Sequence, residues 1–364
     1  MTATAAYGFG RGASWQEATD QALDMLGPVP TANLAFIYFS DRLADDAEAI
    51  CSEVKARTQV RVLSGSAGIG VCCTGLEFMD IPAVVVLALE LPNRSVREVL
   101  SGDDLLAGRG ARFGIAHLDP TQAGLVSRAP DFDGSYFVGG LTSARGKSVQ
   151  ICTDGVATSG ATGVVLSDEV GVATGMSQGC TPLGAWHRVT GGYQNLLTTL
   201  DDRPALEVLM EDAAEITGGD PRNLGDGVLV GVGLPNRDTD DSLVRNLMGV
   251  SIESGAVAIG HDCRPGDRVQ FVRRDAAAAR IDMQRMLDAL AKRTSGRPWA
   301  GLYFSCVARG RHLFGEPAVE LEMIRDTLGE FPLVGFFGNG EICHHEVYGH
   351  TGVLALFTPP ELVQ

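Results

Sequence analysis

A glycine-rich stretch near the C-terminal end, residues 335–341 (GFFGNGE), carries residue types suited to holding a small molecule. Glycine accepts positive φ and lets a ligand or another backbone approach closely, and Asn339 tolerates the left-handed region. Glu341 is the only carboxylate between Phe331 and Cys343. The N–H groups of such a glycine corner suit an anion, whereas Asn339 and Glu341 suit an ammonium group. The alternative is an ordinary turn between core strands.

Two further glycine corners occur earlier in the chain. Residues 65–70 (GSAGIG) contain Gly65, Ser66 and Gly68, and residues 139–143 (GGLTS) contain Gly139 and Gly140. If the three corners meet around one cleft, their N–H groups could hold a carboxylate or a phosphate. We therefore expect these residues to line a ligand site.

Two arginines are candidate partners for an anionic ligand. Arg309 lies in SCVARGR (305–311) and Arg273 in VRRD (272–275). A guanidinium binds a carboxylate through two parallel hydrogen bonds, which makes arginine a good anion receptor. The alternative is that both arginines pair with acidic side chains of the protein itself.

The first corner also invites a comparison with serine hydrolases. A nucleophile elbow has the pattern G-x-S-x-G around its serine, and here the position two before Ser66 is Ser64 rather than glycine. No histidine stands in an obvious supporting context. We expect the protein not to be an enzyme, with a hydrolase acting through Ser66 as a third alternative.

A run of metal-ligating residue types follows the third corner: Cys343, His344, His345 and, further on, His350. The spacing lacks the paired ligands of a closed zinc site, and adjacent residues of a strand point to opposite faces. We expect no metal site. A single histidine could ligate haem, although the absence of CxxCH excludes covalent haem attachment.

The chain has eight cysteines in 364 residues and no CxxC pair, so we expect reduced thiols, most of them buried. Two of them, Cys180 and Cys306, could line the ligand cleft, although buried packing is the alternative.

The charge and hydropathy of the chain exclude several classes of partner. A net charge of −16 repels nucleic acid and anionic membranes, and no basic stripe offsets it. The N-terminal residues 1–11 resemble no targeting signal, and the longest apolar run is far below the roughly 20 residues that span a bilayer. We expect a cytoplasmic protein without membrane insertion.

The corners belong to a repeated pattern of strand, helix, glycine corner and strand. Residues 35–40, 60–70 and 83–89 form one copy, and residues 300–305, 332–340 and 351–357 form another, with Tyr-Phe-Ser in the first strand of both. A weaker copy runs through residues 113–118, 136–140 and 163–166. Repeats at this spacing indicate duplicated units that bury their apolar faces against one another.

The pattern predicts an α/β chain of the α+β type, in which largely antiparallel sheets are flanked by helices. Ser14 and Glu17 form a capping box for a helix over residues 15–26, and further helices are expected at 45–57, 95–100, 205–217 and 275–292. The change from strands to a helix near residue 201 divides the chain into two lobes, residues 1–200 and 201–364.

Several motifs together resemble the FIST sensory domain family, in both its N-terminal and its C-terminal parts. They are SQGCTPLG (177–184), LVRNLMGV (243–250), GDRVQFVRRDA (266–276), YFSCVARGRHLFG (303–315) and PLVGFFGNGEI (332–342). The resemblance covers about residues 10–358.

This resemblance implies a bacterial-type signal-input module that binds a small ligand, with amino acids among the candidates. Some relatives bind haem and sense nitric oxide, which makes a haem-based sensor the alternative. Relatives act beside histidine kinases and other signalling proteins. Because no kinase, F-box or cyclase motif is visible, we expect a partner to carry the output.

Overall fold

The computed structural model describes residues 4–100, 113–124, 136–225, 227–233, 242–294 and 298–359. The chain forms two compact units. Unit 1 comprises Met1–Gln178 together with Asp282–Gln364, and unit 2 comprises Gly179–Ile281. Unit 2 is therefore an insertion in unit 1. The predicted division near residue 200 falls inside unit 2, at the end of strand β16 (Leu196–Leu200).

Unit 1 contains three copies of one strand pattern, including the copy that is weak in the sequence. Each copy has two parallel neighbouring strands, then a hairpin, then a strand antiparallel to the first. Copy 1 contains β2 (Leu34–Ser40), β3 (Val62–Gly68), β4 (Gly70–Cys73), β5 (Leu76–Met79) and β6 (Ala83–Glu90). Copy 2 contains β8 (Phe113–Leu118), β9 (Tyr136–Leu141), β10 (Gln150–Cys152), β11 (Gly155–Ala157) and β12 (Ala161–Leu166). Copy 3 contains β22 (Ala300–Cys306), β23 (Leu333–Gly338), β24 (Glu341–Cys343), β25 (Glu346–Tyr348) and β26 (Thr351–Thr358).

Each copy gives its hairpin to the sheet of another copy. The hairpin β4–β5 pairs with β23, the hairpin β24–β25 pairs with β9, and the hairpin β10–β11 pairs with β3. The exchange closes a cycle among three six-stranded sheets. The other edge of each sheet is formed by a strand that precedes the copy in the sequence. These edge strands are β1 (Thr4–Arg11), β7 (Val96–Val99) and β13 (Gly171–Gln178), which pair with β6, β12 and β26.

The shared Tyr-Phe-Ser letters are out of register between copies 1 and 3. Gly65 of β3 lies opposite Ile37, whereas the equivalent Gly335 of β23 lies opposite Tyr303. Tyr303 therefore corresponds to Ile37, and Tyr38 corresponds to Phe304. A shift of one residue turns a side chain to the other face of a sheet, so the two tyrosines face opposite layers.

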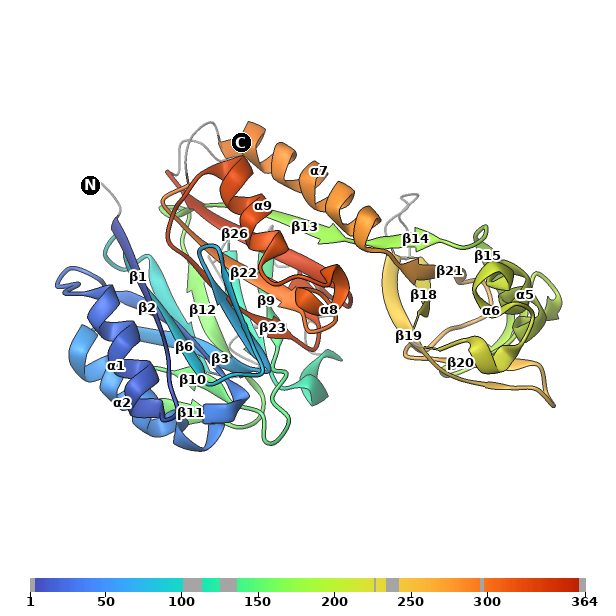
Figure 1. Cartoon of the computed structure of the whole chain (residues 1–364), viewed down its shortest axis with the longest axis horizontal. Helices are drawn as coiled ribbons and strands as arrows, with labels where there is room; N and C mark the ends of the chain where they lie inside the picture. The colour runs from blue at the N-terminus through green and yellow to red at the C-terminus, as the bar shows by residue number, and fades with distance from the viewer. Residues whose placement is uncertain are drawn as a thin grey trace. The chain divides into compact units, whose positions relative to one another are not determined.

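Helices cover the outer faces of two of the sheets. The first sheet packs against α1 (Trp15–Leu26) and α2 (Ala47–Thr58), which lie side by side (Figure 1). The sheet of copy 3 packs against α7 (Ala276–Thr294) and α9 (Val319–Leu328). The predicted cap of α1 is confirmed, because Ser14 Oγ accepts from Glu17 N at 3.2 Å. Apolar burial on these faces supplies most of the stabilisation.

The helix predicted at residues 95–100 is wrong, because Val96–Val99 form strand β7. Its pairing with β12 satisfies the backbone, and the two valines at its ends are buried in the sheet. This tertiary pairing outweighs the local helical preference.

Unit 2 is a closed ring of six antiparallel strands with short helices. In ring order the strands are β15 (His187–Tyr193), β16, β20 (Ala256–Ile259), β19 (Ser242–Ser251), β18 (Val228–Gly233) and β21 (Arg268–Arg274), which pairs again with β15. The strands β14 (Cys180–Pro182) and β17 (Arg203–Pro204) pair at its edges, and α5 (Ala205–Asp212) and α6 (Ala214–Thr217) follow β17. Further short helices among the described residues are η1 (Asp41–Asp46), η2 (Pro120–Gln122), η3 (Pro221–Asn223) and α8 (Arg311–Phe314). No helix in the described part of the chain is long and apolar enough to cross a membrane.

Candidate functional site

The three glycine corners meet within unit 1. Gly70 pairs with Phe337, and Glu341 pairs with Gly140. At the first and third corners the chain leaves one sheet and enters the next, between β3 and β4 and between β23 and β24. The hairpin exchange therefore brings together corners that are far apart in the sequence.

The corner N–H groups are used inside the protein. Ile69 N donates to Ser143 Oγ at 2.9 Å, Leu141 N donates to Gly340 O at 2.8 Å, and Asn339 N donates to Leu141 O at 3.0 Å. These three N–H groups are therefore not available to an anion in this conformation.

The equivalent glycines serve strand packing. A Cβ at Gly65, Gly139 or Gly335 would lie 1.8, 1.9 or 1.7 Å from the carbonyl oxygen of the residue opposite. Only glycine permits this approach of the two parallel strands. Of the other predicted corner residues, Ser66 and Gly68 lie in β3, both buried, while Asn339 is exposed.

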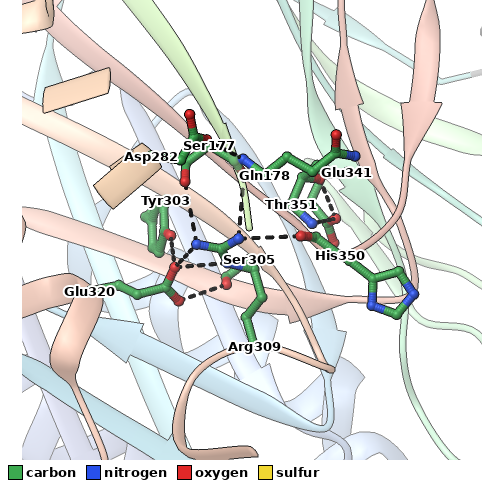
Figure 2. A network of polar contacts seen from close by, with 10 residues as sticks. All are labelled: Ser177, Gln178, Asp282, Tyr303, Ser305, Arg309, Glu320, Glu341, His350 and Thr351. Atoms are coloured by element: carbon green, nitrogen blue, oxygen red, sulfur yellow. Dashed lines mark hydrogen bonds and ion pairs between the residues drawn. The ribbon is translucent and has the colours of Figure 1, made fainter. Parts of the chain in front are cut away.

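Arg309 is buried in a network of polar side chains (Figure 2). Its Nε and Nη2 donate to Glu320 Oε1 at 2.8 and 2.6 Å. Its Nη1 donates to the carbonyl oxygens of His350 and Ser177 at 3.2 and 3.5 Å, and Nη2 also donates to Ser177 Oγ at 3.4 Å. All five N–H groups of the guanidinium thus have acceptors. In this conformation Arg309 has no donor left for a ligand.

Three elements place the charged pair. Arg309 follows the end of β22, and Glu320 lies in the first turn of α9, where the helix dipole favours a carboxylate. Tyr303 Oη donates to Glu320 Oε1 at 2.8 Å, and Ser305 Oγ donates to Oε2 at 3.2 Å. A buried ion pair persists only when its remaining polar atoms are satisfied in this way.

The network reaches the two points at which the chain enters and leaves unit 2. Ser177, which accepts from Arg309, stands near the end of β13. The next residue, Gln178, donates its N–H to Asp282 Oδ2 of α7 at 2.7 Å (Figure 2). Arg309 and Asp282 together hold the end of β13.

Glu341 is a buried carboxyl with an incomplete set of hydrogen bonds. Its Oε2 accepts from Thr351 Oγ1 at 2.6 Å and from Thr351 N at 3.3 Å. Its Oε1 has no hydrogen-bond partner among the described residues. Burial, opposed only in part by Thr351, raises the pKa of Glu341 well above its usual value.

Family models match most of the chain. The FIST N domain matches residues 33–203, and the FIST C domain matches residues 205–344. The chain belongs to the FIST family. An uncharacterized protein of Mycobacterium tuberculosis strain H37Rv is 32% identical over 377 residues, which cover 95% of this chain and 96% of the relative. An uncharacterized protein of Mycobacterium bovis is 31% identical over 369 residues, with 94% of each chain covered.

Four buried aromatic rings from strands of the three sheets pack together in this FIST protein. Tyr38, His117 and Phe304 occupy equivalent positions in the three copies, with ring centroids 5.5 to 6.3 Å apart. Phe336 contacts all three, at 5.3 to 6.1 Å. Sequence reasoning missed this layer, because the residues that meet there belong to strands that are far apart in the chain.

A hydrolase acting through Ser66 would need a histidine beside that serine. The histidine of this layer, His117, lies beside Ser64 instead. His117 Nδ1 lies 3.4 Å from Ser64 Oγ, and Nε2 lies 3.0 Å from Tyr38 Oη. Burial lowers the pKa of His117 to about 3, so its ring is neutral at pH 7. Ser66 Oγ instead donates to the carbonyl oxygens of Ala67 and Val149, at 3.1 and 3.3 Å.

The two predicted cysteines and Arg273 lie in different surroundings. Cys306 ends β22, and burial raises the pKa of its thiol to about 12. Cys180 and Arg273 belong to unit 2, where Cys180 packs against an apolar cluster and Arg273 Nη2 lies 3.5 Å from Asp275 Oδ2. None of the eight cysteines, all in described segments, forms a disulfide.

Within the described residues, no group of three His, Cys, Asp or Glu side chains is arranged to hold a metal ion.

The acidic partner of Arg309, Glu320, was not among the predicted site residues. Its only signal in the sequence is an acidic residue at the start of an apolar helix, a pattern that many surface helices share.

Proposed function

We propose that this FIST protein is a sensory, signal-input protein, and that its ligand is a small molecule with an ammonium or similar donor group. Amino acids are the first candidates. The observation that carries the proposal is Oε1 of Glu341, a fully buried carboxyl oxygen without a hydrogen-bond partner among the described residues. Family membership supports the sensory role.

The chemistry of Glu341 favours a donor over an anion. A buried polar atom without a partner costs about 1–3 kcal/mol, and a charge-assisted hydrogen bond would remove that cost. Because burial raises the pKa of Glu341 well above its usual value, the neutral form of this carboxyl is favoured. An ammonium ligand would favour the carboxylate, so its binding would release a proton and strengthen as the pH rises.

A thermal-shift screen of amino acids and small carboxylates tests this proposal. We expect at least one amino acid to raise Tm in a saturable way at millimolar concentration. Glu341→Gln should abolish the shift. Glu330→Gln, which makes the same substitution at an exposed position, should leave it intact. A screen in which no compound raises Tm would contradict the proposal.

We place the protein in the cytoplasm and expect a separate signalling protein, such as a histidine kinase, to carry its output. Pull-down of a kinase that depends on the ligand identified in the screen would test the partner.

Haem is the alternative cofactor, and two histidines whose ring nitrogens both contact other side chains, His117 and His187, fit it poorly. The ring of His117 packs among aromatic side chains with both nitrogens near other groups, and both nitrogens of His187 contact carboxylates. Haem titration decides the alternative, since a specific site gives a sharp Soret band that one His→Ala change abolishes.

We also propose that the protein is not an enzyme. The hydroxyl of Ser66 is fully buried and donates to main-chain carbonyls, which suits packing rather than attack on a substrate. Turnover of generic esters that is lost in Ser66→Ala would overturn this view.

A further inference from the structure

The imidazole of His187 lies between two carboxylates within unit 2. His187 Nδ1 is 2.7 Å from Asp201 Oδ2, and Nε2 is 2.9 Å from Asp212 Oδ2. His187 begins β15, Asp201 lies in the turn between β16 and β17, and Asp212 is the last residue of α5. One side chain thus joins strand β15, the β16–β17 turn and helix α5 of unit 2.

This geometry requires a particular protonation state. A carboxylate only accepts hydrogen bonds, so both ring nitrogens must carry hydrogen, and only the imidazolium does. A neutral ring would turn a lone pair toward one of the carboxylates. The His187 and Asp212 side chains are only 14% and 15% exposed, so water screens their contact weakly, whereas Asp201 is 48% exposed and its contact is screened more strongly.

We propose that His187 is a proton-operated clamp. In the protonated form it holds the end of α5 and the β16–β17 turn against β15, and loss of the proton releases one of the two. The proposal concerns unit 2 alone and does not depend on the ligand proposed at Glu341.

The clamp also holds the loop between β14 and β15. The carboxyl group of Asp212 packs directly on Gly184, where an added Cβ would lie 2.1 Å from Asp212 Cγ. Gln270 Nε2 donates to Gly184 O at 2.9 Å. Movement of Asp212 therefore changes the surroundings of this loop as well as the end of α5.

The charged groups around the imidazole of His187 favour its protonated form. Burial lowers the pKa of His187, but Asp201 and Asp212 outweigh it, and the pKa is raised above its usual value. Glu211 lies close enough to interact with His187, and Arg203 binds Glu211. On β15 the neighbouring charged residue is Arg188, whose main-chain N–H donates to Asp201 Oδ1. On β21 it is Arg268, whose guanidinium lies over the ring of Trp186.

The sign of the pH effect follows from the raised pKa. A group with a raised pKa in the folded protein stabilises it fully below the unfolded value of about 6.5. This contribution disappears as the pH rises through the folded pKa. We therefore expect the clamp to be closed below about pH 6.5 and to open as the pH rises through the raised pKa of the folded protein.

NMR of the ¹⁵N-histidine-labelled full chain tests the proposal, with the His187 signals assigned by their loss in His187→Gln. We expect two protonated ring nitrogens at about pH 6 and a titration midpoint above the usual histidine value. In Asp212→Asn, which keeps an acceptor oxygen but removes the charge, the midpoint should fall. A ring with one proton at that pH, or a midpoint unchanged in Asp212→Asn, would overturn the clamp.

Hydrogen exchange separates a switch from a static contact. Protection factors at residues 201–217 should fall by about tenfold or more between about pH 6 and about pH 9 in the wild type. They should not depend on pH in His187→Gln. The matched control His261→Gln removes a half-buried histidine of the same unit and should behave like the wild type. Equal pH dependence in His187→Gln and wild type would show that His187 does not operate a switch.

Discussion

Arg309 and Glu320 form an ion pair with exposed side-chain fractions of 1% and 3%. Withdrawing two charges from water is costly, and their attraction repays this only when every remaining polar atom is satisfied. Tyr303, Ser305 and Ser177 supply those contacts. The pair therefore specifies where β22, α9 and β13 meet.

Removing one member of this pair should be strongly destabilising. We expect Glu320→Gln to lower the free energy of unfolding by about 3–5 kcal/mol, because the guanidinium is left buried without its counter-charge. The double variant Glu320→Leu with Arg309→Met should lose much less than the sum of the two single changes. Urea unfolding of the wild type, Glu320→Leu, Arg309→Met and the double variant completes a double-mutant cycle that measures this difference. Additive losses of unfolding free energy would contradict it.

Glu341 should make the stability of the ligand-free protein depend on pH. Its pKa is raised in the folded protein, so its favourable contribution is complete below the unfolded value of about 4.5 and is lost as the pH rises. Glu341→Gln should therefore stabilise the protein, and the gain should grow with pH by at most about 1.4 kcal/mol per unit.

Chemical unfolding at several pH values checks this gain, with Glu330→Gln as the exposed control. A gain that is the same at acidic and alkaline pH would show that Glu341 does not titrate differently in the two states.

At the scale of elements, the parallel strand pairs depend on one glycine each. The two strands approach so closely at Gly65, Gly139 and Gly335 that the carbonyl oxygen opposite occupies the place of a Cβ. These glycines set the register of the copies, which is why they, and not the Tyr-Phe-Ser letters, identify equivalent positions.

Gly335→Ala should disrupt the pairing of β22 and β23. The new Cβ would lie 1.7 Å from Tyr303 O, so the strands must separate, and we expect a loss of about 3 kcal/mol in unfolding free energy. Gly146→Ala is the control, because no atom lies within 4 Å of its added Cβ. Differential scanning fluorimetry of both variants compares the effects, and a Tm for Gly335→Ala equal to that of Gly146→Ala would refute the packing role.

At the scale of the whole molecule, the hairpin exchange links the three copies of unit 1. No sheet in the cycle is complete without a hairpin from another copy. Loss of one copy therefore removes strands from the sheet of a second, and unit 1 should unfold as one cooperative body.

Tryptophan fluorescence tests this cooperativity. Unit 1 contains Trp15, beside the core of copy 1, and Trp299, whose ring packs on Phe357 in copy 3 at 5.4 Å. In a Trp186→Phe background, removal of Trp299 leaves Trp15 as the single reporter, for copy 1, and removal of Trp15 leaves Trp299, for copy 3. We expect coincident urea transitions from the two reporters. Separate midpoints would show that the copies unfold independently.

Some features of this protein follow from the order of its residues alone. The apolar strands, the capped helix α1, the repetition of a glycine corner and the FIST motifs are local or sequential signals, because each depends on residues that are close in the chain. The α+β class follows from them.

Tertiary structure alone decided what the corners do. Corner amides that could have faced a ligand bond one another, because the hairpins cross between sheets. Whether Arg309 binds a ligand or Glu320, and whether a tyrosine faces the helices or the inner layer, depends on one residue of register and on long-range pairing. No local pattern contains that information, since the free energy that selects it comes from contacts between distant segments.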